Sequence, residues 1–271
     1  MVKVSFFDKK LRSQYLNFLS LLSLVLSLIL IFYSIPDGRK VVLAVLFVFM
    51  LLLVYMWIWI RANRLRETVV CVNTTEIKIK FGDIFSEAGL RVIPFNEYFD
   101  TQVDDKIIAQ KTLNGVYLKN WVNDISALNS KILKETKGCP FKINKKRSAG
   151  KKIQYKLGTI VFHDGFLLTA FSRFDESNKA FLKMEDYLDF LLFFWEEIDR
   201  VYAGKGIVVP LLGSGMTRFK NNESITGQEL LEMLVWSFKV SRVHFKYGAK
   251  ITIVIDETKK DEINLFKLNG V

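Results

Sequence analysis

Two uninterrupted apolar stretches near the N-terminus constrain this 271-residue chain more than any other feature. No Asp, Glu, Lys or Arg occurs at positions 14–35 or 41–60. At about 1.5 Å of rise per residue, a helix of either length crosses a hydrocarbon core of roughly 30 Å. The residues between them, 36–40 (Pro-Asp-Gly-Arg-Lys), are typical of a tight turn. We therefore expect an antiparallel hairpin of two transmembrane helices.

Basic residues flank this hairpin at both outer ends. They are concentrated in the N-terminal residues 1–13 and in the linker 61–67, whereas the turn carries only Arg39 and Lys40. Under the positive-inside rule, both termini lie in the cytoplasm and the turn lies outside. A cleaved signal peptide is the alternative, but a second apolar stretch follows at once and no small-residue cleavage site precedes it. The expected location is the bacterial inner membrane, crossed twice.

The first apolar stretch carries a polar stripe, and two interpretations of it are open. Its members share one helical face because they are spaced three, three, four and seven residues apart. Close helix packing through small polar side chains is one interpretation, and a weakly polar pore lining in an assembly of hairpins is the other. The second stretch has no such stripe. The members are Asn17, Ser20, Ser23, Ser27 and Ser34.

The composition of the whole chain narrows its possible functions. The net charge of +11 suggests contact with anionic lipid or a phosphate-rich ligand. We find no base-reading motif and expect no nucleic-acid partner. Two cysteines and two histidines are too few for a structural zinc site, and reduced thiols facing a cytosol are the simplest interpretation. Neither histidine, His163 or His244, lies in an acid–nucleophile pattern, so we expect no metal and no catalytic residue.

Strand and helix patterns alternate along residues 68–271, which predicts an α/β sheet covered on both faces by helices. A basic run at 142–152 contains no acid and is expected to be a solvated loop or a loop held near anionic lipid. Thr226 and Glu229 are spaced as a capping box at a helix start. The expected strands are 68–72, 76–81, 90–94, 160–162, 166–171, 206–212 and 250–256, and the expected helices are 123–135, 183–202 and 226–240, with a short C-terminal helix.

The strongest local motif is the apolar strand at 207–212 that runs into Gly213-Ser214-Gly215. Glycines allow backbone N–H groups to approach an anion without interference from Cβ atoms. Ligands in open α/β sheets bind at the carboxyl ends of strands. A plain tight turn is the alternative. The glycines stand one residue from the serine, so the motif is not a nucleophile elbow. It is not a P-loop either, because no Gly-Lys-Ser/Thr sequence appears.

These segments together resemble the macro domain, a fold that binds ADP-ribose and related nucleotides. A strand ending in Gly-Asp-Ile at 82–84 comes early, and one ending in Pro-Leu-Leu-Gly-Ser-Gly-Met at 210–216 comes late. Behind two apolar helices, this arrangement is similar to the membrane-anchored effectors of Thoeris anti-phage systems. The segments carrying the closer resemblance are 93–101 (IPFNEYFDT), 155–159 (YKLGT) and 210–218 (PLLGSGMTR).

The resemblance implies a role for individual positions. Asp83 would accept a hydrogen bond from the adenine amino group, with Ile84 beside the ring. Asn96 occupies the place of the first asparagine in the Val-Asn-Ala-Ala-Asn segment of macro domains, and Arg218 would add positive charge. The diphosphate would be wrapped by Gly213, Ser214, Gly215 and Met216.

The sequence also departs from the family pattern. Glu97 to Phe99 replace the residues that include the second asparagine, and Leu113-Asn114-Gly115 stand in for the usual Gly-Gly-Val loop. The missing elements usually position the distal ribose and, in hydrolases, the attacking water. Asp100 and Thr101 are expected to recognise the terminal group of the ligand. Tyr98 and Phe99 are expected either to stack on that group or to pack in the core.

By this resemblance, the chain is expected to be a non-enzymatic membrane effector without a cofactor. A partner TIR-domain protein would make an NAD-derived signal nucleotide that contains ADP-ribose. Binding would drive homo-oligomerisation and disrupt the inner membrane, leading to abortive infection. The alternatives are a membrane-tethered hydrolase of ADP-ribose derivatives and a constitutive structural or lipid-binding protein.

Overall fold

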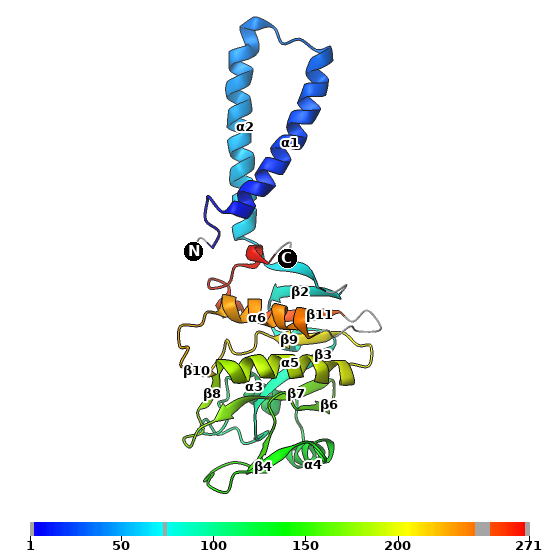
Figure 1. Cartoon of the computed structure of the whole chain (residues 1–271), viewed down its shortest axis with the longest axis vertical. Coiled ribbons are helices and arrows are strands. Elements are labelled where there is room, and N and C mark those ends of the chain that lie inside the picture. The colour runs from blue at the N-terminus through cyan, green and yellow to red at the C-terminus, as the bar shows by residue number, and fades with distance from the viewer. Residues whose placement is uncertain (1–2, 73–74, 242–249, 269–271) are drawn as a thin grey trace. The chain divides into compact units, whose positions relative to one another are not determined.

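The computed structural model describes residues 3–72, 75–241 and 250–268, and these form two compact units. One unit contains the N-terminal residues up to Arg66 together with the short C-terminal segment Asn264–Lys267. The other contains the rest of the described chain from Glu67 onward. Figure 1 shows the helical hairpin of the first unit and the mixed sheet of the second.

Two long helices make up the hairpin, α1 (Lys9–Phe32) and α2 (Asp37–Asn63). Both are long and apolar enough to cross a membrane. α2 extends beyond its predicted span at both ends, whereas α1 begins before its predicted span and ends at Phe32, three residues before the predicted end at 35. The non-helical turn is residues 33–36 instead of the predicted 36–40. Pro36 occupies the N-cap position and has a φ of −58°, and Asp37 lies in the first helical turn, where an acidic side chain is favourable. The predicted loop residues 37–40 therefore begin α2.

The polar stripe of α1 does not form the α1–α2 interface. Tyr15 contacts α2 through a hydrogen bond from its hydroxyl to the carbonyl oxygen of Leu51, 3.2 Å away. The stripe lies on the exposed side of α1, and Ser34 falls beyond the end of that helix. The exposed stripe residues are Asn17, Ser20, Ser23 and Ser27.

A nine-stranded mixed sheet forms the centre of the second unit, in the order β1-β2-β11-β9-β3-β7-β8-β10 with β6 beside β7. β2, β11, β9, β3 and β7 are mutually parallel neighbours, and antiparallel pairs flank them. The predicted strands are confirmed with small shifts at their ends. Their bounds are β1 Glu67–Val72, β2 Thr75–Phe81, β3 Leu90–Asn96, β6 Ile160–His163, β7 Phe166–Phe174, β9 Ile207–Pro210 and β11 Ile251–Ile255. The sheet also contains two short strands that were not predicted, β8 (Ala180–Lys183) and β10 (Arg218–Lys220).

Helices cover both faces of this sheet, as the sequence predicts. Successive residues of a strand point to opposite faces. Phe166 of β7 packs on Tyr117, whereas Phe171 packs on Tyr187 and Phe190. Tyr117 belongs to α3 (Leu113–Asn120), which shares its face with α4 (Ile125–Glu135). The opposite face carries α5 (Met184–Val201) and α6 (Gly227–Val240).

The predicted capping box is present at the start of α6. The Thr226 hydroxyl accepts from the backbone N–H of Glu229 at 3.2 Å, and the Glu229 carboxylate accepts from the backbone N–H of Thr226 at 2.8 Å. Two donors at the helix start are thereby satisfied.

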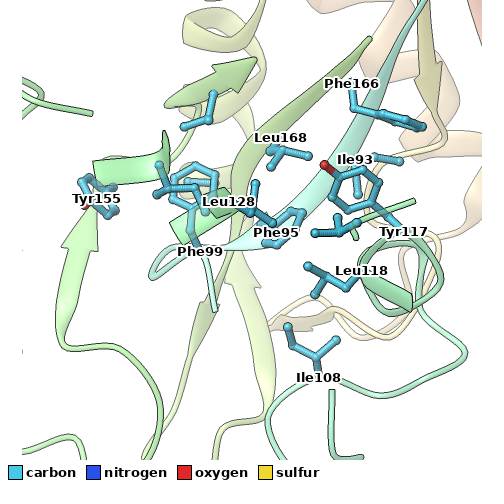
Figure 2. Packing of buried hydrophobic residues seen from close by; sticks show 14 of the residues in the cluster. Ile93, Phe95, Phe99, Ile108, Tyr117, Leu118, Leu128, Tyr155, Phe166 and Leu168 are labelled. Atoms are coloured by element: carbon cyan, nitrogen blue, oxygen red, sulfur yellow. The ribbon is translucent and has the colours of Figure 1, made fainter. Parts of the chain in front are cut away.

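An aromatic core lies between the central strands and α3 and α4 (Figure 2). Phe95 and Phe99 lie 5.9 Å apart between ring centroids, and Phe95 meets Tyr117 edge to face at 6.1 Å. Phe99 is fully buried although its φ is +48°, in the left-handed region that disfavours side chains. Core packing of Phe99 is therefore the outcome observed.

Close approach explains the glycine at position 115, which lies in the first turn of α3. A Cβ atom added there would lie 2.3 Å from the carbonyl oxygen of Ala109 and 3.0 Å from that of Gln110. Both obstacles are backbone atoms, which cannot move aside as a flexible side chain does.

We expect Gly115→Ala to lower the free energy of unfolding by about 1–3 kcal/mol, the usual cost of overpacking. The measurement is denaturant unfolding of the full chain in detergent micelles. Gly206→Ala is the matched control, because a Cβ at Gly206 meets its nearest neighbour at an ordinary 3.6 Å. Equal unfolding midpoints for both variants and the parent would contradict this explanation.

Candidate functional site

The candidate site lies where the parallel strands end. The backbone N–H of Gly82, after β2, donates to the carbonyl of Ile255 in β11 at 2.9 Å. The N–H of Leu211, after β9, donates to the carbonyl of Val254 at 3.0 Å. These bonds align the segments that follow β2, β11 and β9 at one edge of the sheet. The end of β3 lies at the same edge, three strand spacings or about 14 Å from β2.

The glycine-rich loop after β9 is held in one conformation by its surroundings. Gly213 has a φ of +88°, and a Cβ there would lie 2.9 Å from the ring of Phe219. The Ser214 hydroxyl donates to the carbonyl of Leu211 at 2.7 Å, and the Tyr187 hydroxyl of α5 donates to that of Leu212 at 3.1 Å. In contrast, a Cβ at Gly215 would meet nothing within 4 Å. Contacts with Phe219 and Tyr187 therefore fix the loop on its protein side, and the space next to Gly215 is unfilled.

A cleft of about 670 Å³ opens beside this loop. The structure brings four of the predicted site residues to its wall, Gly213, Ser214, Gly215 and Arg218. The opposite wall is made by the start of α6 and by the chain after β11, where Lys259 and Glu262 form an ion pair of 3.0 Å. Lys259 belongs to the short 3-10 helix η2 (Glu257–Lys259).

Asp83 and Ile84 follow β2 but do not line this cleft. Asp83 is exposed, and its Oδ1 accepts from the backbone N–H of Phe85 at 3.0 Å, which starts the 3-10 helix η1 (Ile84–Ser86). Its other oxygen, Oδ2, has no hydrogen-bond partner among the described residues. Ile84 is buried against Val208 and Val254. The burial of Ile84 therefore fixes the position of Asp83, whose Oδ2 atom has no hydrogen-bond partner among the described residues.

Asn96 and Asp100 lie in a buried polar network at the end of β3. Asn96 Oδ1 accepts from the backbone N–H groups of Tyr98 and Asp100, and its Nδ2 donates to Asp100 at 3.0 Å. Asp100 also pairs with Arg147 at 2.6 Å and accepts from the backbone N–H of Lys151 at 2.7 Å. Both residues are 1% exposed. Their side chains hold the loop between β4 and β5, and ligand contact by them stays a prediction.

This network corrects the interpretation of the basic run for Arg147 and Lys151, because the Lys151 ammonium is turned inward and donates to the carbonyl of Phe99. Arg147 is buried, stacks 3.9 Å from the ring centroid of Tyr98 and donates to Asn178 at 2.8 Å. It is therefore neither solvated nor free to meet lipid. Sequence analysis missed its role because nothing in a run of lysines and arginines marks which cation turns inward. The basic run covers most of the antiparallel strand pair β4 (Phe141–Ile143) and β5 (Ile153–Tyr155) and the loop between them.

The remaining predicted site residues, Thr101, Asn114, Gly115 and Met216, do not line the cleft. The Thr101 hydroxyl donates to Asn129 of α4 at 3.1 Å. Asn114 Oδ1 accepts from the Thr112 hydroxyl at 2.6 Å, within the first turn of α3. Met216 is 56% exposed. The structure therefore does not bring Thr101, Asn114 and Gly115 to the cleft, and their binding roles stay predictions.

Glu97 is a second buried acid that the sequence did not single out. It is 2% exposed, pairs with Arg173 at 3.2 Å and accepts from Gln154 at 2.7 Å. Glu97 stands in the segment where macro domains carry their second asparagine, so this chain uses the position for an internal ion pair.

The histidines carry no catalytic arrangement in the described part of the chain. His163 Nδ1 shares a hydrogen bond of 2.7 Å with the Tyr117 hydroxyl, and burial raises the pKa of that tyrosine. His244 lies outside the described residues. Within residues 3–72, 75–241 and 250–268, no group of three or more His, Cys, Asp or Glu side chains is placed to hold a metal ion.

The sheet order, the helices on both faces and the loop after β9 define a macro-domain-like α/β module. A family model described as "Thoeris protein ThsA, Macro domain" matches residues 77–256. The chain is also 36% identical to Thoeris protein ThsA of Bacillus amyloliquefaciens (strain Y2) over 269 residues, which is 96% of this chain and 89% of that protein. The chain belongs to the Thoeris ThsA family.

A comparison with solved structures finds a macrodomain from Oceanobacillus iheyensis. A point variant of that macrodomain covers 74% of this chain and 91% of its own, with 12% identity and a TM-score of 0.47. The same macrodomain with ADP covers 74% and 92%, with 10% identity and a TM-score of 0.45.

We expect Arg147→Met to lower the free energy of unfolding by about 3–5 kcal/mol, because it leaves Asp100 charged, buried and unpaired. Denaturant unfolding of the full chain measures this, with exposed Lys146→Met as the control from the same run. The double variant Asp100→Asn with Arg147→Met should recover part of the loss. A single variant as stable as its control would refute the buried network.

Stability should also depend on pH through Lys151. Burial lowers the pKa of Lys151 to about 8, against a smaller opposing effect of Asp100. The unfolded chain therefore holds this proton up to about pH 10.4, whereas the folded chain releases it near pH 8. Because the unfolded state binds more protons in that window, parental stability relative to Lys151→Met should rise from pH 8 to 10. A difference in unfolding free energy that stays flat across this window would contradict it.

Proposed function

We propose that this chain is a membrane effector of anti-phage defence whose macro domain binds an NAD-derived nucleotide containing ADP-ribose. The observation that carries the proposal is the aligned edge of strand ends, where Asp83 and the glycine-rich loop flank β11. Membership of the Thoeris ThsA family supports the defence role. The protein acts as a receptor that needs no cofactor, and it binds its ligand without hydrolysing it.

The two ends of the edge suit different parts of such a nucleotide. Asp83 presents a carboxylate oxygen that accepts from no donor in the described part of the chain, which suits the amino group of adenine. The open backbone at Ser214 and Gly215, with Arg218 beside it, suits a diphosphate. Asp83 follows β2 and the loop follows β9, so one strand, β11, separates the two subsites.

A receptor role is favoured over hydrolysis by the state of the polar residues after β3. The Asn96 side chain donates to Asp100, whereas Asp100 and Glu97 each pair with an arginine, and all three residues are buried. An attacking water needs an oriented acceptor that is free to receive its proton. The side chains of Asn96, Glu97 and Asp100 instead form hydrogen bonds and ion pairs that hold the neighbouring loops in place.

In this proposal, the hairpin of α1 and α2 is the part of the protein that disrupts the membrane. With both termini in the cytoplasm, the macro domain meets nucleotides made by a TIR-domain partner during infection. The α1 stripe of Asn17, Ser20, Ser23 and Ser27 faces away from α2, which leaves small polar side chains for packing between copies of the chain. Homo-oligomerisation through this face disrupts the inner membrane and ends the infection abortively. The ligand drives the change only by binding the active arrangement more tightly than the resting one.

Calorimetric titration of the full chain in lipid nanodiscs tests this function. The parent should bind ADP-ribose, or the products that a TIR-domain enzyme forms from NAD, saturably, and the nucleotide should be recovered intact. Asp83→Ala should weaken binding by roughly 10–100-fold, the value of a hydrogen bond to a charged group. Gly215→Ala should weaken it without loss of stability, because its Cβ meets open space that the ligand would need.

Asp164→Asn is the matched control, since Asp164 is an exposed acid in the β6–β7 turn. It should bind as the parent does. A folded parent without saturable binding, or an Asp83→Ala variant with parental affinity, would contradict the proposal. Release of a hydrolysis product would favour the enzyme instead.

A further inference from the structure

The chain returns to the hairpin unit at its far end. Asn264–Lys267, here called the C-terminal turn, belongs to the same compact unit as α1 and α2. It contains the 3-10 helix η3 (Leu265–Lys267). The macro unit is therefore joined covalently to the hairpin unit at both of its ends.

Apolar contacts seat the C-terminal turn at the base of the hairpin. Phe266 is 5% exposed and shares a cluster with Val4, Leu11 and Ala62, each of which is also buried. Trp59 packs against this cluster and donates from Nε1 to the Val4 carbonyl at 3.0 Å. Phe266 thus fills the space between the N-terminal residues and the end of α2.

Polar contacts fix the orientation of the same turn. Asn264 Nδ2 donates to the carbonyl of Lys3 at 3.2 Å, and its Oδ1 accepts from the N–H of Phe266 at 3.0 Å. The Lys10 ammonium donates to the carbonyl of Lys267 at 3.3 Å and lies 5.6 Å from the Phe266 ring centroid. Asn63, at the end of α2, accepts from the N–H groups of Lys3 and Val4 at 2.8 and 2.9 Å.

The residues just before the turn belong to the wall of the cleft. Lys259 and Glu262 line the cleft and pair with each other. Ile263 is fully buried and lies beside Gly227, which also lines the cleft. A Cβ atom added at Gly227 would lie 3.4 Å from Cδ1 of Ile263. Only Ile263 separates Glu262 from Asn264, a span of at most about 7 Å. So short a segment has little slack to absorb a shift of Glu262.

We propose that residues 259–267 couple occupancy of the cleft to the base of the hairpin, an inference that rests on the proposed nucleotide binding. The Lys259–Glu262 pair is partly exposed, so a diphosphate competes readily with Glu262 for the lysine. Exchange of partners moves the segment that carries Ile263. The C-terminal turn passes that movement to the cluster of Val4, Leu11 and Ala62.

Hydrogen–deuterium exchange of the full chain in nanodiscs, with ADP-ribose as the probe, tests this coupling. In the parent, ADP-ribose should protect residues 213–218 and change exchange in residues 3–12 and 58–66. In Phe266→Ala, ADP-ribose should still protect 213–218, while residues 3–12 and 58–66 no longer respond. Without nucleotide, this variant should already exchange roughly tenfold faster at residues 3–12, because a buried aromatic contact is lost.

Lys267→Ala is the matched control, because the turn uses the carbonyl of Lys267 and leaves its side chain exposed. It should respond as the parent does. Asn264→Ala removes the side-chain hydrogen bonds to Lys3 and Phe266 but leaves the apolar cluster intact, and it provides a milder variant if Phe266→Ala misfolds. A parent whose cleft is protected while the hairpin base stays unchanged overturns the coupling and leaves the proposed function standing. A cleft that ADP-ribose never protects overturns the proposed function, and the coupling with it.

Discussion

The parallel alignment of β2, β11, β9 and β3 is the constraint on which the rest of the macro unit depends. It brings Asp83, the chain after β11 and the glycine-rich loop to one edge of the sheet, although they are far apart in sequence. Helices on both faces keep these strands buried, and the Tyr187 hydroxyl of α5 fixes the glycine-rich loop by donating to the carbonyl of Leu212. The site that we propose for an elongated anion depends on this strand order together with one Gly-x-Gly sequence.

The sequence predicts the parts of the fold that follow from local periodicity. Apolar alternation identifies the central strands, the capping box marks the start of α6, and the uncharged stretches identify both hairpin helices. Their ends are less predictable, because capping decides them. Asp8 accepts from the N–H groups of Lys10 and Leu11 and starts α1 earlier than the uncharged stretch does, while Pro36 starts α2 directly. Strand order depends on contacts between distant residues that local patterns do not contain.

The candidate site also has one part that the sequence predicts and one part that it does not. The loop at 213–215 is predictable because glycine there has a conformational reason, which the φ of Gly213 supports. The network of Asp100, Arg147 and Glu97 is not, because an exposed cation and a buried one look alike in a basic run. Partnering decides which acids are free for a ligand. Asp83 retains an oxygen without a partner among the described residues, whereas Asp100 is engaged by Arg147 and Lys151.

The central claim is that a nucleotide bound at the strand ends acts on the membrane through the hairpin. Dye release from vesicles that contain the full chain tests it most directly. We predict that nucleotides formed from NAD by a TIR-domain enzyme release the dye at concentrations that saturate binding, and that vesicles without nucleotide stay sealed. Vesicles that stay sealed while the protein is fully occupied would contradict the account.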